Sequence, residues 1–182
     1  MTSDDPLALT KRPGLPDALR VLADVYPRAD WTAHPNFGEM IRFWMDRHAM
    51  FRQLTDVMRD DLQSLVDGKS DFATYAPRLS HFGGTLLNQL HGHHQIEDHH
   101  YFPQLIQLDP RLERGFDLLE TDHAAMDGLL HEMAEGANGV LQGGQPAPFL
   151  DTLEGFTTLL ERHLTDEEEI VVPVVLETGF RG

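Results

Sequence analysis

The sequence has no cysteine among its 182 residues. Disulfide bonds, thiolate catalysis, iron–sulfur clusters and cysteine-ligated zinc are therefore excluded, and any bound metal must be held by nitrogen and oxygen atoms. Basic residues are also scarce, since 14 Lys and Arg stand against 30 Asp and Glu and give a formal net charge of −16. This charge argues against nucleic acid and anionic membranes as partners, because both would repel the chain.

Long apolar runs are missing as well. No segment approaches the ~20 consecutive apolar residues of a membrane span, and the N-terminus lacks a basic stretch followed by an apolar one. We therefore expect a cytoplasmic protein. No segment alternates polar and apolar residues with the period of a β-strand. Because 41% of the residues are hydrophobic, the chain can bury a substantial core, and we expect one all-α domain.

Apolar residues instead recur at three- and four-residue intervals in four stretches, which predicts four helices. The expected helices begin at Glu39 after a cap at Asn36, at Pro77, at Asp109-Pro110 and at Phe149. They end near Asp67-Gly68, Pro103, Gly136 and Val174. We expect an antiparallel up-down four-helix bundle over residues 37–176. An extended leader of residues 1–36, with at most one short helix around Asp17 to Val25, precedes it, and a tail of residues 177–182 follows.

Two copies of a His-x-x-x-Glu motif carry the chemistry of the chain, at residues 93–97 and 163–167, and each is followed by a proline. On an α-helix, residues four apart lie on the same face, so each imidazole and its carboxylate can converge on one metal ion or on two adjacent ions. His48 and His123 alternate with these motifs along the chain. The order indicates a duplicated helix pair that faces its copy across a shared site.

The glutamates of both motifs lie on core-facing stripes. Burial of a carboxylate costs several kcal/mol unless it is paired, protonated or bound to a metal, and no Lys or Arg occupies the stripe beside Glu97 or Glu167. The alternative is that each histidine is a hydrogen-bonded core residue and each glutamate reaches solvent, which would require four stripes to converge by accident. We therefore predict a metal site formed by His48, His93, Glu97, His123, His163 and Glu167.

The sequence resembles the hemerythrin-like family, also called the HHE cation-binding domain, from about Phe37 to Val175. The resemblance rests on His48, His93-His-Gln-Ile-Glu97 with Asp98 and Tyr101-Phe-Pro103, Glu120-Thr-Asp-His123, and His163 with Glu167, Glu168 and Pro173. It implies a bundle around a non-haem di-iron centre with an oxo or hydroxo bridge. The four histidines would be ligands, and both glutamates would bridge the two irons. The resemblance favours iron, whereas imidazole and carboxylate also suit manganese or zinc.

One departure from the family bears on function. The oxygen-carrying hemerythrins place a second histidine four residues after the third-helix histidine, where this chain has Asp127. Without that fifth imidazole, both metals would keep an open or water-filled position unless Asp127, a weaker candidate ligand, fills one. We expect a protein that binds, senses or buffers a small oxidant or diatomic ligand such as oxygen or nitric oxide.

Two other functions stay open: an oxidoreductase acting on peroxide or nitric oxide, and a bundle whose metal is stored or structural. Turnover needs electrons, and the sequence has no flavin fingerprint or haem motif to receive them. An enzyme would therefore need an electron-donor protein, and a sensor would need an output protein. The oligomeric state is not fixed by the sequence.

The remaining polar residues near the motifs are weaker candidates. His94 faces about a quarter-turn from His93, and His100 lies on the side of Glu97, so either could support or replace a ligand. Surface or capping roles are expected for His34, His81, His91, His99 and His131. Asp98, Glu168 and Glu169 are expected either to accept hydrogen bonds from ligands or to form a solvated acidic face, and Tyr101 is expected to pack.

Overall fold

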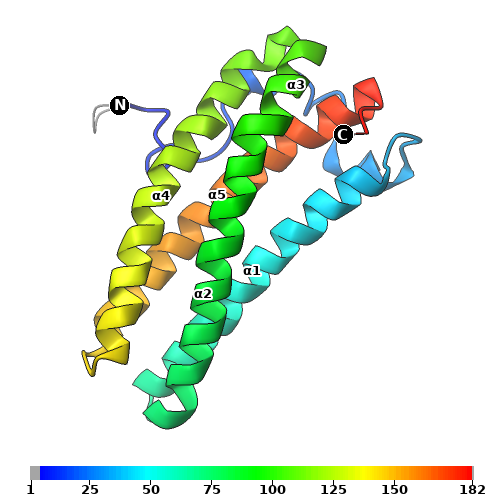
Figure 1. Cartoon of the computed structure of the whole chain (residues 1–182). Coiled ribbons are helices and arrows are strands. Elements are labelled where there is room, and N and C mark those ends of the chain that lie inside the picture. The colour runs from blue at the N-terminus through cyan, green and yellow to red at the C-terminus, as the bar shows by residue number, and fades with distance from the viewer. Residues whose placement is uncertain (1–4, 182) are drawn as a thin grey trace.

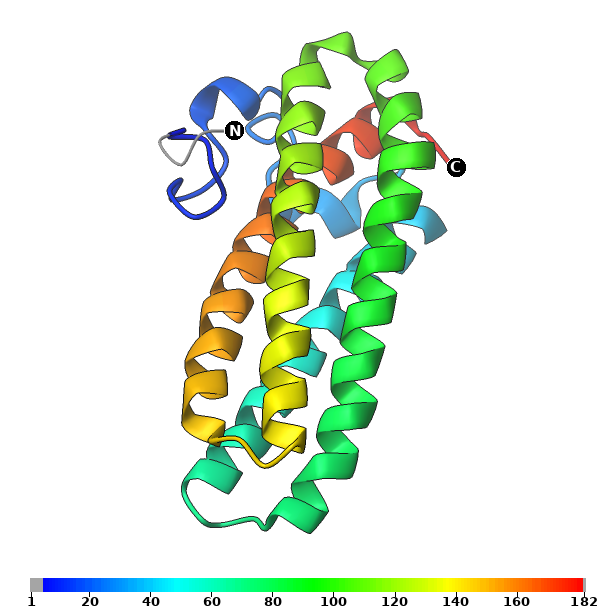
Figure 2. The same ribbon diagram turned by 60° about the vertical axis from the view of Figure 1, so that its left-hand side comes forward.

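A computed structural model describes residues 5–181 and shows an elongated bundle of helices (Figure 1). Four long helices run side by side, and a short one caps the end at which the chain passes from the second to the third of them (Figure 2). No strand occurs in residues 5–181, so the prediction of an all-α bundle is confirmed. The α-helices are α1 (Glu39–Val66), α2 (Phe72–Ile96), α3 (Phe102–Leu108), α4 (Glu113–Leu141) and α5 (Pro146–Thr178).

The α1 start predicted at Glu39 is confirmed, but the predicted start of α2 and the predicted cap of α1 were wrong. α2 begins at Phe72, five residues before Pro77, because the Asp71 side chain accepts a hydrogen bond from the Thr74 amide and caps the helix there. Pro77 lies in the second turn of α2 and has no amide hydrogen to donate to the Ala73 carbonyl. Because Ala73 is exposed, water can bond to that carbonyl instead. Asn36 does not cap α1; its side chain donates to the Leu176 carbonyl at the end of α5.

The helical path continues past α2 through a π-helical turn, Glu97–Tyr101, into α3. In this turn the Phe102 amide donates to the Glu97 carbonyl, five residues earlier. Pro103 has no amide to donate, and its ring crowds the preceding turn, so the wider turn accommodates it. The wider turn begins at Glu97, one of the predicted metal ligands. In α5 the corresponding Pro173 lies inside a continuous helix, which ends at Gly179 with φ 69°.

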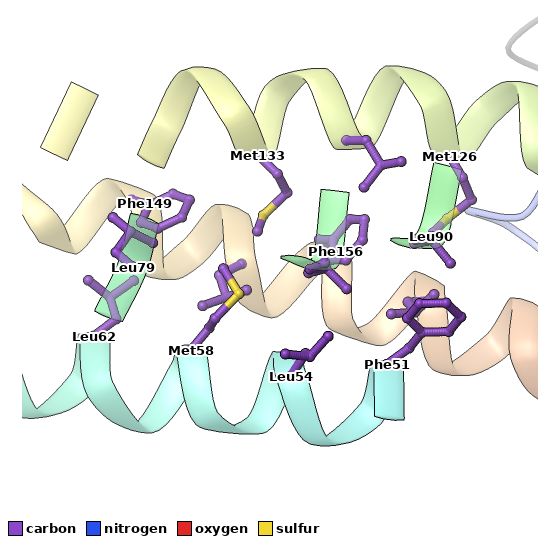
Figure 3. Packing of buried hydrophobic residues seen from close by; sticks show 14 of the residues in the cluster. Phe51, Leu54, Met58, Leu62, Leu79, Leu90, Met126, Met133, Phe149 and Phe156 are labelled. Carbon is purple, nitrogen blue, oxygen red and sulfur yellow. The ribbon is translucent and has the colours of Figure 1, made fainter. Parts of the chain in front are cut away.

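Two buried hydrophobic clusters fill the two halves of the bundle. The first lies toward the α1–α2 and α4–α5 connections, and Figure 3 shows Met58, Met133 and Phe156 of this cluster pointing toward one another from three helices. The second cluster includes residues of α1, α3, α4 and α5 and of the leader. In sequence order along α1, α4, α5 and the helical path from α2 into α3, the predicted ligands fall between residues of one cluster and residues of the other. The predicted site therefore forms a polar layer across the core.

The leader is not a simple extended arm. Residues Asp17–Leu19 and Arg28–Ala33 form 3-10 turns, so the expected short helix from Asp17 to Val25 is reduced to a single turn. Leu15, Leu19 and Trp31 are buried in the second cluster. None of the helices formed by residues 5–181 is long and apolar enough to span a membrane.

Candidate metal centre

The structure brings all six predicted ligands together in the polar layer. Together with His94, they fall into two neighbouring groups, and within each group one candidate ligand atom per residue lies within 4.8 Å of every other. All except His93 are buried, and the His93 side chain is 10% exposed. One group consists of His48, His93, Glu97 and Glu167. The other consists of His94, His123 and His163.

Each glutamate directs one carboxylate oxygen toward the imidazoles of its own group and the other oxygen toward the imidazoles of the second group. Glu97 Oε1 lies 2.8 Å from His93 Nε2, and Glu97 Oε2 lies 3.7 Å from His123 Nε2. Glu167 behaves in the same way, because its Oε1 lies 3.3 Å from His48 Nε2 and its Oε2 lies 3.5 Å from His163 Nε2. Both carboxylates therefore lie between the two groups of imidazoles.

Three outer carboxylates orient the imidazoles. Nδ1 of His123 lies 2.6 Å from Asp98 Oδ1, and Nδ1 of His48 lies 2.9 Å from Glu168 Oε1. The contact of His163 Nδ1 with Asp122 is longer, at 3.4 Å. A proton on Nδ1 that is donated to a carboxylate leaves Nε2 free as a lone pair, and this arrangement is common around metal-binding histidines.

Arginines hold two of these outer carboxylates, Glu168 and Asp122, in turn. Arg52 of α1 donates to Glu168 at 2.8 Å, and Arg28 of the leader donates to its other oxygen at 2.6 Å. Arg12, also from the leader, is buried and bonds to both Asp122 and Asp166. Arg12 is thus two contacts removed from His163. The leader contributes cations to the layer behind the ligands, which the sequence analysis did not anticipate.

Unpartnered polar atoms show that the inner layer fits a cation. Among residues 5–181, the buried side-chain nitrogens and oxygens without a hydrogen-bond partner all belong to this layer, apart from the Tyr75 hydroxyl. They are both ring nitrogens of His94, both oxygens of Glu97, Nε2 of His123 and of His163, and Oε2 of Glu167. Such atoms are costly to bury, and a bound cation would satisfy them together.

Burial dominates the ionisation of the glutamates. Burial, followed by the negative charge of Glu167, raises the pKa of Glu97 well above its usual range. Burial would also raise the pKa of Glu167, but the neighbouring His48 imidazolium outweighs it and lowers that pKa. Two carboxylates so close together cannot both be ionised cheaply without a cation between them.

The imidazoles respond to the same surroundings. Burial lowers the pKa of His93 to about 3 and lowers the pKa values of His94 and His163. These rings are therefore neutral near pH 7, which is the form that binds a metal. Burial also acts to lower the pKa of His48, but Glu167 and Glu168 raise it to about 9, so a cation bound there would displace a proton.

The structure places the weaker candidates differently from one another. His94 is buried in the layer, and its ring stacks on that of His123 with centroids 4.0 Å apart. Asp127 belongs to neither group; its side chain is 52% exposed and lies 3.3 Å from His91 Nδ1. His100 is exposed, whereas Tyr101 packs against Trp44.

A sequence signal for His94 existed. Leu86, Leu90 and His94 are spaced by four and lie on one buried stripe of α2, while His93 lies about 100° around the helix toward α1. α2 contacts both α1 and α4, so the two adjacent histidines reach different neighbours. No comparable signal marked Arg12, because its partners lie on α4 and α5, far away in the sequence.

Comparison with known proteins identifies the family. The family model described as the hemerythrin HHE cation binding domain matches residues 39–175, which contain every residue of the two groups. No curated protein and no solved structure matched the chain. The matched region covers most of the chain, and its His/Glu layer is cation-binding in composition and arrangement. The chain belongs to the hemerythrin HHE cation-binding domain family.

Proposed function

We propose that the protein is a non-haem di-iron protein that binds, senses or buffers a small oxidant or diatomic ligand such as oxygen or nitric oxide. The arrangement of the two glutamates carries the proposal. Each offers one oxygen to each group of imidazoles, as expected of carboxylates shared by two adjacent ions. A single ion would leave one set of these atoms without a partner.

The ligand set that we propose has seven residues, because His94 joins the six predicted from the sequence. His94, His123 and His163 would hold one ion, His48 and His93 the other, and Glu97 and Glu167 would lie between them. His94 thereby supplies the fifth imidazole that the sequence analysis found missing at Asp127. It comes from α2 instead of α4.

Neutral imidazole and carboxylate ligands suit iron, manganese and zinc, and iron is the ion that this family implies. Iron bound in this way can change oxidation state and accept oxygen or nitric oxide as a further ligand. The surrounding residues have supporting roles. The carboxylates at His48, His123 and His163 hold the rings in one orientation, and the two hydrophobic clusters restrict the entry of water.

The proposal is tested by loading the protein with ferrous iron under anaerobic conditions and admitting oxygen through cycles of degassing. A visible spectrum that changes and recovers in each cycle would establish reversible binding. A single permanent change to a ferric spectrum would indicate sensing or buffering, and nitric oxide would be admitted next. A protein that binds no iron, or whose iron responds to neither gas, would contradict the proposal. Consumption of peroxide with added reductant would instead support an oxidoreductase.

A further inference from the structure

Arg28 of the leader lies one carboxylate away from a proposed metal ligand. Its guanidinium donates to Glu168 Oε2 at 2.6 Å, and Glu168 Oε1 lies 2.9 Å from Nδ1 of His48. The Glu168 side chain is fully buried, whereas the Arg28 side chain is 47% exposed. The Arg28 guanidinium also lies over the Trp31 ring, 4.6 Å from its centroid. The leader therefore holds Arg28 in place while this residue bonds to a carboxylate inside the bundle.

Arg12 makes the equivalent connection to the other group of ligands. It donates to Asp122 Oδ1 at 2.8 Å, and Asp122 Oδ2 lies 3.4 Å from Nδ1 of His163. His48 and His163 belong to different groups, so residues 12–28 reach both proposed metal positions. Because each arginine acts on an imidazole through a carboxylate, the two arginines are positioning residues and not ligands.

Apolar contacts hold the leader on the bundle in the same region. Leu15, Leu19, Leu22 and Trp31 are buried in the second hydrophobic cluster. The backbone of the leader forms only short turns, such as the one in which the Leu19 amide donates to the Pro16 carbonyl at 2.8 Å. Segments with so few backbone hydrogen bonds open locally at a lower free energy than long packed helices. We therefore expect the leader to open while the bundle stays folded.

We propose that docking of the leader and binding of metal are coupled, so that the leader transmits the occupancy of the metal centre to the surface of the protein. The coupling runs through Arg12 and Arg28, which fix the carboxylates that orient His163 and His48. Such coupling is reciprocal, because leader docking must strengthen metal binding by the same factor by which metal strengthens docking. The inference rests on the proposed function for a metal in the layer, but not for the identity of that metal.

Two opposing effects determine the sign of the coupling. The charge of Arg28 repels a nearby metal ion, whereas its bond to Glu168 helps to hold the His48 ring in one orientation. Glu168 lies between them, and its negative charge offsets the repulsion. Loss of a residue that orients a ligand weakens metal binding about 10- to 100-fold. Because Arg52 also bonds to Glu168, we expect the low end of this range for Arg28.

Metal affinity is the first measurement. The full chain is titrated with Zn²⁺ and, under anaerobic conditions, with Fe²⁺, in competition with a chelator. Arg28→Gln should weaken metal binding about tenfold. Arg28→Lys should recover most of this loss, because Arg28 reaches Glu168 through one nitrogen, which an ammonium can replace. Unchanged or tighter metal binding in Arg28→Gln would overturn the proposal.

Arg20→Gln is the matched control for this titration. Arg20 lies in the same leader and pairs with Glu169, the residue next to Glu168 on α5. Within residues 5–181, Glu169 bonds to no imidazole, so this ion pair does not orient a ligand. The metal affinity of Arg20→Gln should stay within about twofold of the wild type. An equal loss of affinity in Arg20→Gln and Arg28→Gln would overturn the role of Glu168 in the coupling.

Amide hydrogen exchange measures the reciprocal effect. The Leu19 and Tyr26 amides donate to carbonyls within the leader, so their exchange reports its opening. Bound Zn²⁺ should slow this exchange about tenfold in the wild type and less than about threefold in Arg28→Gln. Exchange of the Gly144 amide, at the opposite end of the bundle from the leader, should not change with metal (Figure 2).

The outcomes separate this inference from the proposed function. Equal exchange of the leader amides with and without bound metal would overturn the coupling, even if the protein binds iron. Protection of the leader by Zn²⁺ in a protein that binds no iron would support the coupling and refute the proposed function alone.

Discussion

The leader residue Arg12 makes the strongest prediction about stability. Its guanidinium lies in the bundle at 4% exposure and bonds to Asp122 of α4 and Asp166 of α5. In the variant Arg12→Leu, both carboxylates stay buried, with side-chain exposures of 1% and 2%, and lose their cation. Asp122 keeps only its long contact with His163.

The expected decrease in the free energy of unfolding follows from the general cost of breaking a buried ion pair. Removal of one partner destabilises a protein by about 3 to 5 kcal/mol, because the remaining charge is desolvated without compensation. With a urea dependence of about 3 kcal/mol per M for a chain of this size, the unfolding midpoint should fall by about 1 to 2 M. Arg12→Leu combined with Asp166→Leu should recover about half of the loss, because one of the unpaired charges is then removed as well.

The assay is urea unfolding of the metal-free protein, followed by far-UV circular dichroism, so that metal binding does not contribute. Arg20→Leu is the control. Arg20 lies in the same leader and pairs with Glu169, but its side chain is 29% exposed, so the loss should not exceed about 1 kcal/mol. If Arg12→Leu also lowered the free energy of unfolding by no more than about 1 kcal/mol, Arg12 would not form the buried ion pairs with Asp122 and Asp166 in the protein in solution.

Four further predictions concern the metal layer. His94→Ala should lower the number of iron ions held per chain or weaken one of them, whereas the exposed His91→Ala should not, as measured by iron analysis after dialysis. Asp127→Ala should leave iron content unchanged, and a loss of iron would restore Asp127 as a ligand. Asp98→Asn should weaken metal binding about 10- to 100-fold in a competitive chelator titration, since the carboxylate orients His123. Removal of the metal should lower the melting temperature, because a ligand at 100 times its Kd adds about 2.7 kcal/mol to stability; an unchanged melting temperature would count against a metal bound in the folded core.

The helical architecture was predictable because apolar spacing identifies core-facing stripes. The element boundaries were less so. Pro77 predicts a start for α2 five residues too late, whereas the Asp71 cap precedes an aromatic and apolar stretch in the usual way and marks the true start. The π-helical turn at Glu97–Tyr101 depends on how the chain accommodates Pro103 while α3 packs against α4 and α5, which no local pattern reveals.

The same distinction holds for the site. The His-x-x-x-Glu motifs placed four ligands on two helices through local geometry alone. His94 was harder to predict, because two adjacent histidines cannot share one helix face and the His-x-x-x-Glu spacing identifies only the face that carries His93. Arg12 and Arg28 act across more than a hundred residues of sequence, so only the folded leader brings them to Asp122 and Glu168.

The measurement that tests the account most directly is the number and coupling of iron ions per chain. The ferrous-loaded protein, oxidised under controlled conditions, would be examined by iron analysis and Mössbauer spectroscopy, alongside Glu97→Gln and Glu167→Gln. The account predicts two magnetically coupled irons per chain and a loss of that coupling or of one iron in each variant. One iron per chain, or two uncoupled irons that both variants retain, would contradict it.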